Sequence, residues 1–113
     1  MGPDAAPAEG LAQALADVAG RTFQSAPGQT WVRLRTLSQS QYAENEASVE
    51  ATELPVFVNV LKRQVPPKTE LEREIAALAK AIAKMTGRSV ARIHIQYAPA
   101  AVGRLSFGGK IVE

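Results

Sequence analysis

The sequence of 113 residues is 46% hydrophobic and 21% charged, which is the ordinary composition of one soluble globular domain. It contains no cysteine, so disulfides, thiolate metal sites and a cysteine nucleophile are excluded. No apolar run approaches the roughly 18 to 20 residues that cross a bilayer, and a formal charge of +2 is too small to indicate nucleic acid by itself. We therefore expect a single domain over residues 1–113, located in the cytoplasm.

The first residues predict an irregular start followed by a helix. Residues 1–6, MGPDAA, resemble a disordered or tag-derived beginning. From about Pro7 onward a helix is expected, because Leu11, Leu15 and Val18 recur at near-helical spacing among alanines. The SAPG segment that follows contains proline and glycine and ends this helix.

A strand and a long loop are expected next. The residues from Thr30 to Leu37, TWVRLRTL, show the alternation of a β-strand. Residues 38–53 carry little apolar material and are expected to form a long polar loop. Tyr42 either lines a pocket from this loop or anchors the loop to the body. Negative charge is concentrated at the glutamates of the loop, Glu44, Glu46, Glu50 and Glu53.

The second half of the chain begins with a strand and a helix. Pro55 opens a strand from Val56 to Leu61, at a position where its missing N–H does least harm. Thr69 and Glu72 have the spacing of a capping box, in which each side chain satisfies the other's backbone N–H, and predict the start of a helix. The apolar stripe of this helix consists of Leu71, Ile75, Leu78, Ile82 and Met85.

A second strand and a short ribbon complete the chain. Gly87 is expected to end the helix as a left-handed cap. The following strand, from Arg92 to Tyr97, lies parallel to the strand 56–61 if both share a sheet, since a helical crossover of this length makes a right-handed β-α-β unit. Beyond it, AVGRLSFGGKIVE predicts a tight turn and a short ribbon.

Side-chain parity assigns the two faces of the predicted sheet, because successive strand residues face opposite sides. The apolar face, which would receive both helices, consists of Val32, Leu34, Val56, Val58, Val60, Ile93 and Ile95. The other face is mixed and consists of Arg33, Arg35, Asn59, His94 and Gln96, with Trp31 and Phe57 among them. Such a face is either left to solvent or covered by neighbouring subunits.

The order of helix and then strand occurs twice, in AEGLAQALADVAG with TWVRLRTL and in ELEREIAALAKAIAKMTG with ARIHIQYA. From about Pro7 to the C-terminus, and most clearly in LPVFVNVLKR and RIHIQYAPAAVGRLSFGG, the sequence resembles the tautomerase superfamily. The resemblance implies an α+β fold built as a β-α-β pseudo-repeat, with two helices packed on one face of a short mixed sheet and a C-terminal ribbon. It also implies assembly as a homotrimer.

A binding site for a small carboxylate is implied by the same resemblance. Arg92 matches a carboxylate-binding arginine of the 4-oxalocrotonate tautomerase branch, and Leu105 matches an apolar pocket residue of its ribbon. Arg33 and Arg35 lie on the strand that borders the active site in longer members of the superfamily. We therefore expect these arginines to hold the carboxylate through charge-assisted hydrogen bonds.

Two further pocket residues follow from the branch that contains macrophage migration inhibitory factor. Its members present a tyrosine and an asparagine to a neighbouring subunit, and His94 and Gln96 occupy those places. The catalytic group of the superfamily is an amino-terminal proline whose secondary amine shuttles a proton. Pro3 follows Met-Gly and Pro55 lies within the chain, so both nitrogens are acylated and neither is a base.

The catalytic residue is therefore unknown, and three explanations stay open. The first residue of this sequence lies downstream of the native start, or the first unit has lost its strand and its activity. In the third explanation His94 has taken over proton transfer, because histidine is a side chain suited to acid–base work at physiological pH. Keto-enol tautomerase or isomerase activity is the expectation if a native N-terminal proline precedes residue 1.

The leading hypothesis is a tautomerase-like or isomerase-like protein that moves a proton in a small enolisable carboxylate or 2-oxo acid. The alternative is a non-catalytic trimeric binding or scaffold protein of the same fold. A ferredoxin-like module is a third possibility, although an RNA-binding version would need an exposed aromatic pair that the predicted sheet lacks. No cofactor, metal, nucleic acid or membrane partner is expected.

Overall fold

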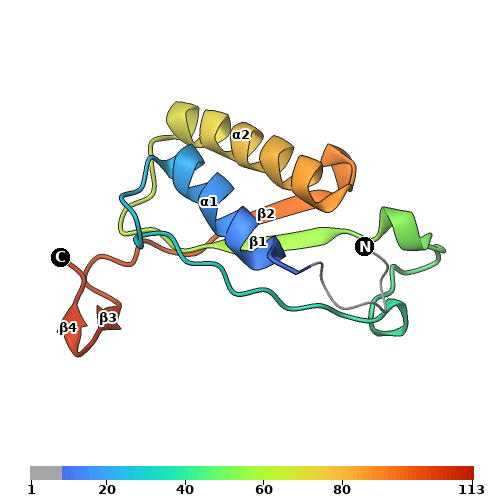
Figure 1. Cartoon of the computed structure of the whole chain (residues 1–113), viewed down its shortest axis with the longest axis horizontal. Helices are drawn as coiled ribbons and strands as arrows, with labels where there is room; N and C mark the ends of the chain where they lie inside the picture. The colour runs from blue at the N-terminus through green and yellow to red at the C-terminus, as the bar shows by residue number, and fades with distance from the viewer. Residues whose placement is uncertain (1–8) are drawn as a thin grey trace.

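Two helices cover one side of a small parallel sheet in the computed structural model, which describes residues 9–113 (Figure 1). The helices are α1, Leu11–Phe23, and α2, Lys68–Thr86. The sheet consists of β1, Val56–Val60, and β2, Ile93–Tyr97. The short elements are the 3₁₀ turns η1 (Gln39–Gln41), η2 (Ala51–Glu53) and η3 (Val90–Arg92), and the hairpin strands β3 (Ser106–Phe107) and β4 (Lys110–Ile111).

The β-α-β unit of the second half is confirmed. β1 and β2 pair in parallel, from Val56 opposite Ile93 to Val60 opposite Tyr97, and α2 forms the crossover between them. The antiparallel pair, β3 with β4, forms a separate ribbon that stands away from the body, beyond the end at which β1 finishes (Figure 1). The α+β architecture with a C-terminal ribbon is therefore present, but parallel and antiparallel pairing occur in two sheets rather than in one mixed sheet.

The core lies between α2 and the inner face of this sheet. Leu78 and Ile82 of α2 are buried against Val60 and Ile93, as the apolar stripe predicts. Met85 is exposed, which corrects that stripe. The buried face also contains Ala79, Ala83 and Thr86, so its centre is rotated away from Met85 around the helix. The strand residues Val56, Val58 and Ile95 pack against this core from the sheet, while Leu15, Ala19 and Phe23 pack against it from α1.

The ends of the helices differ from the expectations at two positions and agree at another. The capping box is wrong, because α2 begins at Lys68 after an N-cap at Pro67, so that Thr69 already lies inside the first turn. No side chain caps this end. Gly87 does end the helix in the left-handed conformation, with φ of 73°, and its N–H binds Ala83 O at 2.9 Å. The helix expected from about Pro7 begins only at Leu11, after an N-cap at Gly10. The disordered start over residues 1–6 lies outside the described residues.

The predicted strand from Thr30 to Leu37 is wrong. These residues form no strand in the described part of the chain, although they run as an extended segment past the sheet (Figure 1). The side chain of Leu34, which was expected to face the helices, is exposed. The segment is held at Trp31, whose indole N–H donates to Gly28 O at 2.8 Å. The Trp31 ring also packs edge-on against the Phe107 ring, with 4.8 Å between the two ring centroids. An alternating pattern becomes a strand only where a second strand lies within hydrogen-bonding distance.

The long polar loop over residues 38–53 is largely irregular, as expected. It contains η1 and η2 and one isolated bridge between Glu44 and Ala47. Within the described residues, no helix combines the length and the apolar character that a membrane crossing requires. The loop matters for function because it passes the amino-terminal ends of both sheet strands and delivers Glu44 to Arg92 (2.6 Å).

Candidate functional site

Arg92 lies immediately before β2, at the amino-terminal end of the sheet. The 3₁₀ turn η3 that carries it is capped by Ser89, whose hydroxyl accepts a hydrogen bond from the backbone N–H of Ala91. The Arg92 guanidinium has two acceptors. Its Nη2 binds Glu44 Oε2 at 2.6 Å, and its Nε donates to Glu53 O at 2.5 Å. Arg92 therefore ties the polar loop to the sheet.

Tyr42 donates a second hydrogen bond to the same carboxylate oxygen of Glu44, at 2.6 Å. The two donors hold the pKa of Glu44 below its ordinary value, with the Tyr42 hydrogen bond as the larger cause and Arg92 as the next. The same bond raises the pKa of Tyr42, because ionising the phenol would place two negative charges side by side. Glu44 also raises the pKa of Arg92. All three groups therefore hold their ordinary charge states firmly at neutral pH.

Aromatic rings connect this ion pair to the outer face of the sheet. The Phe57 ring centroid lies 6.1 Å from that of Tyr42 and 5.4 Å from that of His94. Phe57 and His94 are register partners on β1 and β2, on the face that the helices do not cover. Both side chains are exposed, Phe57 at 63%. We call Tyr42, Glu44, Phe57, Arg92 and His94 the loop-side cluster.

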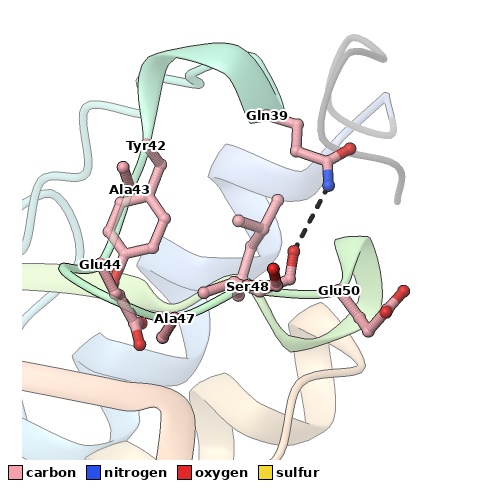
Figure 2. Close-up of a pocket in the computed structure, with 9 residues that line it drawn as sticks. Gln39, Tyr42, Ala43, Glu44, Ala47, Ser48 and Glu50 are labelled. Atoms are coloured by element: carbon pink, nitrogen blue, oxygen red, sulfur yellow. Dashed lines mark hydrogen bonds between the residues drawn. The ribbon is translucent and has the colours of Figure 1, made fainter.

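A hollow of about 370 Å³ adjoins the loop-side cluster within the polar loop (Figure 2). Tyr42 and Glu44 border it on one side, and Gln39 reaches across from the other to donate to Val49 O at 3.4 Å. The Glu50 side chain points away from the hollow. The lining is completed by Ala43, Ala47, Ser48 and Leu54. Tyr42 thus both borders a hollow and anchors the loop, the two roles that the sequence left open.

The remaining residues of the sequence-based site are dispersed within one chain. Gln96 is exposed on the outer face of the sheet, two residues beyond His94. Arg33 and Arg35 are exposed on the extended segment. Leu105 is half-buried beyond the carboxyl-terminal end of the strands, in the turn that leads to the ribbon, whereas Arg92 precedes their amino-terminal end. A single subunit therefore brings His94 close to Arg92 but leaves Leu105 at the opposite end of the sheet.

The sequence did not single out a second polar cluster, at the carboxyl-terminal end of the strands. Glu74 of α2 binds Lys62 Nζ through Oε1 at 2.7 Å and accepts the Tyr97 hydroxyl through Oε2. Lys62 Nζ also lies 4.8 Å from the Phe23 ring centroid. Burial is the larger cause and the Glu74 hydrogen bond the next in raising the pKa of Tyr97. We call Phe23, Lys62, Glu74 and Tyr97 the helix-side cluster.

Sequence signals for these clusters were weak. Glu74 falls on the inward-facing side of an otherwise apolar stripe, one helical turn before Leu78, and a charged residue at that position requires a partner. Glu44 gave no such signal, because it is one of several glutamates in a loop. Among residues 9–113, no group of three or more His, Cys, Asp or Glu side chains is arranged to hold a metal ion.

Comparison with known proteins gives a fold and not a close relative. No protein-family model matches the sequence, and no curated protein matches it. Among solved structures, macrophage migration inhibitory factor from Oncomelania hupensis is similar with a TM-score of 0.71 and 17% identity, over 93% of this chain and 71% of that chain.

Two malonate semialdehyde decarboxylases are similar as well. The FG41 enzyme matches with a TM-score of 0.65 and 17% identity, over 90% of this chain and 82% of its own. A second decarboxylase matches with a TM-score of 0.61 and 10% identity, over 88% of this chain and 78% of its own. Migration inhibitory factor and these decarboxylases are tautomerase superfamily members. The chain therefore has the fold of the tautomerase superfamily.

Proposed function

We propose that this chain is a subunit of a trimeric tautomerase-like protein that binds a small enolisable carboxylate or 2-oxo acid at Arg92 and moves a proton within it. The observation that carries the proposal is a guanidinium already engaged with a carboxylate, 2.6 Å from Glu44, beside His94 on an uncovered sheet face of this fold. Two structural neighbours are named for malonate semialdehyde, a small carboxylate. A planar guanidinium suits that chemistry, since it can give a carboxylate two parallel hydrogen bonds.

The proposed roles of the other residues follow from exposure and charge. Arg33 and Arg35 add positive charge on an exposed segment, which attracts an anion without binding it by themselves. His94 is the candidate for proton transfer among the described residues, because imidazole is the commonest general acid and base in enzymes and this one is exposed beside Phe57. Gln96 and Leu105 would complete the pocket from a neighbouring subunit.

Assembly is proposed because the single chain leaves much apolar surface uncovered. Trp31 is 66% exposed, and Leu37, Phe57, Phe107 and Ile111 are exposed as well. The radius of gyration is 15.4 Å, whereas a compact domain of this length has about 13 Å. In a trimer, the ribbon and outer sheet face would pack against neighbours, and Leu105 of one subunit would approach Arg92 of the next. The single-domain organisation and the cytoplasmic location stay predictions.

The proposal is tested by following enol-to-keto conversion of phenylpyruvate. Arg92→Ala should lower kcat/KM at least about tenfold, the effect of losing one charge-assisted contact with the substrate. Arg73→Ala is the matched control, because Arg73 is an exposed arginine on the outer side of α2, and its activity should equal that of the wild type. If the Arg92→Ala variant is as active as the wild type, Arg92 is not part of the site.

A non-catalytic binding or scaffold protein is the second candidate. The observation that favours it is that Arg92 already has Glu44 and the Glu53 carbonyl as partners, as a purely structural arginine would. Light scattering separates the candidates together with the assay. A trimer without activity on any 2-oxo acid would favour the scaffold, and a monomer would contradict both candidates.

A further inference from the structure

The loop-side cluster contains an internal carboxylate on the arginine that is proposed to bind carboxylates. We propose that Glu44 competes with the substrate for Arg92, and that it thereby sets the affinity and the charge preference of the site. This inference rests on the proposed function of Arg92. It assigns Glu44 a positioning role in specificity, since Glu44 acts through Arg92 and not on the reacting atoms.

The geometry leaves an incoming carboxylate little room on the guanidinium. Glu44 Oε2 takes Nη2 at 2.6 Å, and Glu53 O takes Nε at 2.5 Å, so two of the three nitrogens already have acceptors. A ligand carboxylate that binds the guanidinium in a bidentate way needs two adjacent N–H groups. These two contacts use two of the five N–H groups of the guanidinium, but a carboxylate that pairs with Nη1 and Nη2 would share Nη2 with Glu44 and be repelled by its charge at close range. Tight binding of such a ligand therefore requires Glu44 to move away.

The position of Glu44 makes such a displacement feasible. The side chains of Arg92 and Glu44 are 25% and 33% exposed, so water can solvate both groups when they separate. Glu44 also lines the open hollow of about 370 Å³, which offers space for its carboxylate away from Arg92 (Figure 2). The Tyr42 hydroxyl is able to follow Glu44, because both belong to the same loop and are two residues apart.

Competition has a consequence for specificity. At neutral pH the Arg92–Glu44 pair has no net charge, so the site attracts an anion less than a free arginine would. A weak or poorly aligned anion fails to displace Glu44, whereas a carboxylate that pairs with two guanidinium nitrogens succeeds. Neutralising Glu44 should therefore increase binding of all carboxylates and reduce the discrimination among them.

The test measures binding of pyruvate, a small 2-oxo acid without ring currents, by NMR titration. Glu44→Gln should lower the Kd by roughly two- to fivefold, the effect expected of a partly exposed ion pair. Glu46→Gln is the matched control, because it removes the same charge from an exposed position in the same loop and should leave the Kd unchanged. A purely structural role for Glu44 predicts an equal or weaker affinity.

A second measurement uses the wild-type protein and so does not depend on how a variant folds. Pyruvate should shift the Tyr42 ring resonances with the same Kd as the Arg92 Nε–H resonance, since Tyr42 moves with Glu44 when Glu44 leaves Arg92. The Tyr97 ring, which binds Glu74, should not shift. An Arg92 shift without a Tyr42 shift would overturn the competition.

The two proposals fail in different ways. If Arg92→Ala does not weaken pyruvate binding, the proposed function fails and Glu44 has no ligand to exclude. If Arg92→Ala abolishes binding but Glu44→Gln does not strengthen it relative to Glu46→Gln, the site stands and only the competition is refuted.

Discussion

The loop-side and helix-side clusters have the same chemical parts and different surroundings. In each, one glutamate accepts a hydrogen bond from a tyrosine hydroxyl and pairs with one cation. Glu44 has Tyr42 and Arg92, and Glu74 has Tyr97 and Lys62. They lie at opposite ends of the two parallel strands, since Arg92 precedes β2 and Tyr97 ends it.

The difference lies in how each carboxylate is used. Glu74 binds one partner with each oxygen, and its side chain on α2 is only 12% exposed. Both partners of Glu44 share Oε2, and its side chain is 33% exposed on a loop. Burial is the largest cause of the raised pKa of Tyr97, whereas a hydrogen bond is the largest cause for Tyr42. A glutamate, a tyrosine and a cation therefore have surroundings that suit a structural role in the helix-side cluster and the proposed displacement in the loop-side cluster.

The largest expected effect concerns the helix-side cluster. Glu74→Gln should lower the free energy of unfolding by about 2 kcal/mol, because it removes a charged acceptor from two partly buried donors. Urea denaturation measures this. Glu72→Gln on the exposed side of the same helix is the control, since Glu72 forms a long, exposed ion pair with Lys68 at 4.0 Å. It should change the free energy by less than about 0.5 kcal/mol.

Equal losses of unfolding free energy in Glu74→Gln and Glu72→Gln would contradict a structural role of the helix-side cluster. They would mean that water replaces Glu74 as the partner of Lys62 and Tyr97 as readily as it does for a residue on the open surface.

The next effect is the loss of stability at alkaline pH. The folded protein keeps Tyr97 protonated above its ordinary pKa of 10.0, whereas the unfolded chain ionises there. The stabilisation is therefore complete below pH 10 and is lost as the pH rises towards the raised pKa of the folded state. Urea denaturation between about pH 9 and pH 12 measures the decline.

The two tyrosines serve as each other's control. Tyr97→Phe should remove the larger part of the alkaline decline and Tyr42→Phe the smaller part, because only Tyr97 is raised mainly by burial. The reverse order would mean that the loop-side cluster is the more sequestered of the two.

The smallest expected effect is on stability in the loop-side cluster. Glu44→Gln should leave the urea denaturation midpoint equal to that of Glu46→Gln, because water replaces the partners of a half-exposed carboxylate. A fall in the midpoint as large as that of Glu74→Gln would show that the loop-side cluster is structural as well. It would also argue against displacement of Glu44 by a ligand.

The β-α-β unit was predictable because its signals are local. Alternating β-branched residues after Pro55, a helical stripe around Leu78 and the glycine at position 87 each act within a few residues. The right-handed crossover rule then supplied the parallel pairing of β1 and β2. The segment from Thr30 to Leu37 has an equally clear alternation, yet it forms no strand in the described part of the chain.

Local pattern thus determined the β-α-β unit of this protein and most of the residues that face its core. The tertiary structure alone decided which extended segment is paired and which charged groups meet, because Glu44 and Arg92 are 48 positions apart, and Lys62, Glu74 and Tyr97 come from separate elements. Hydrogen bonds and ion pairs depend on distances of a few ångströms, and no periodicity along the chain encodes a distance between segments that only folding brings together.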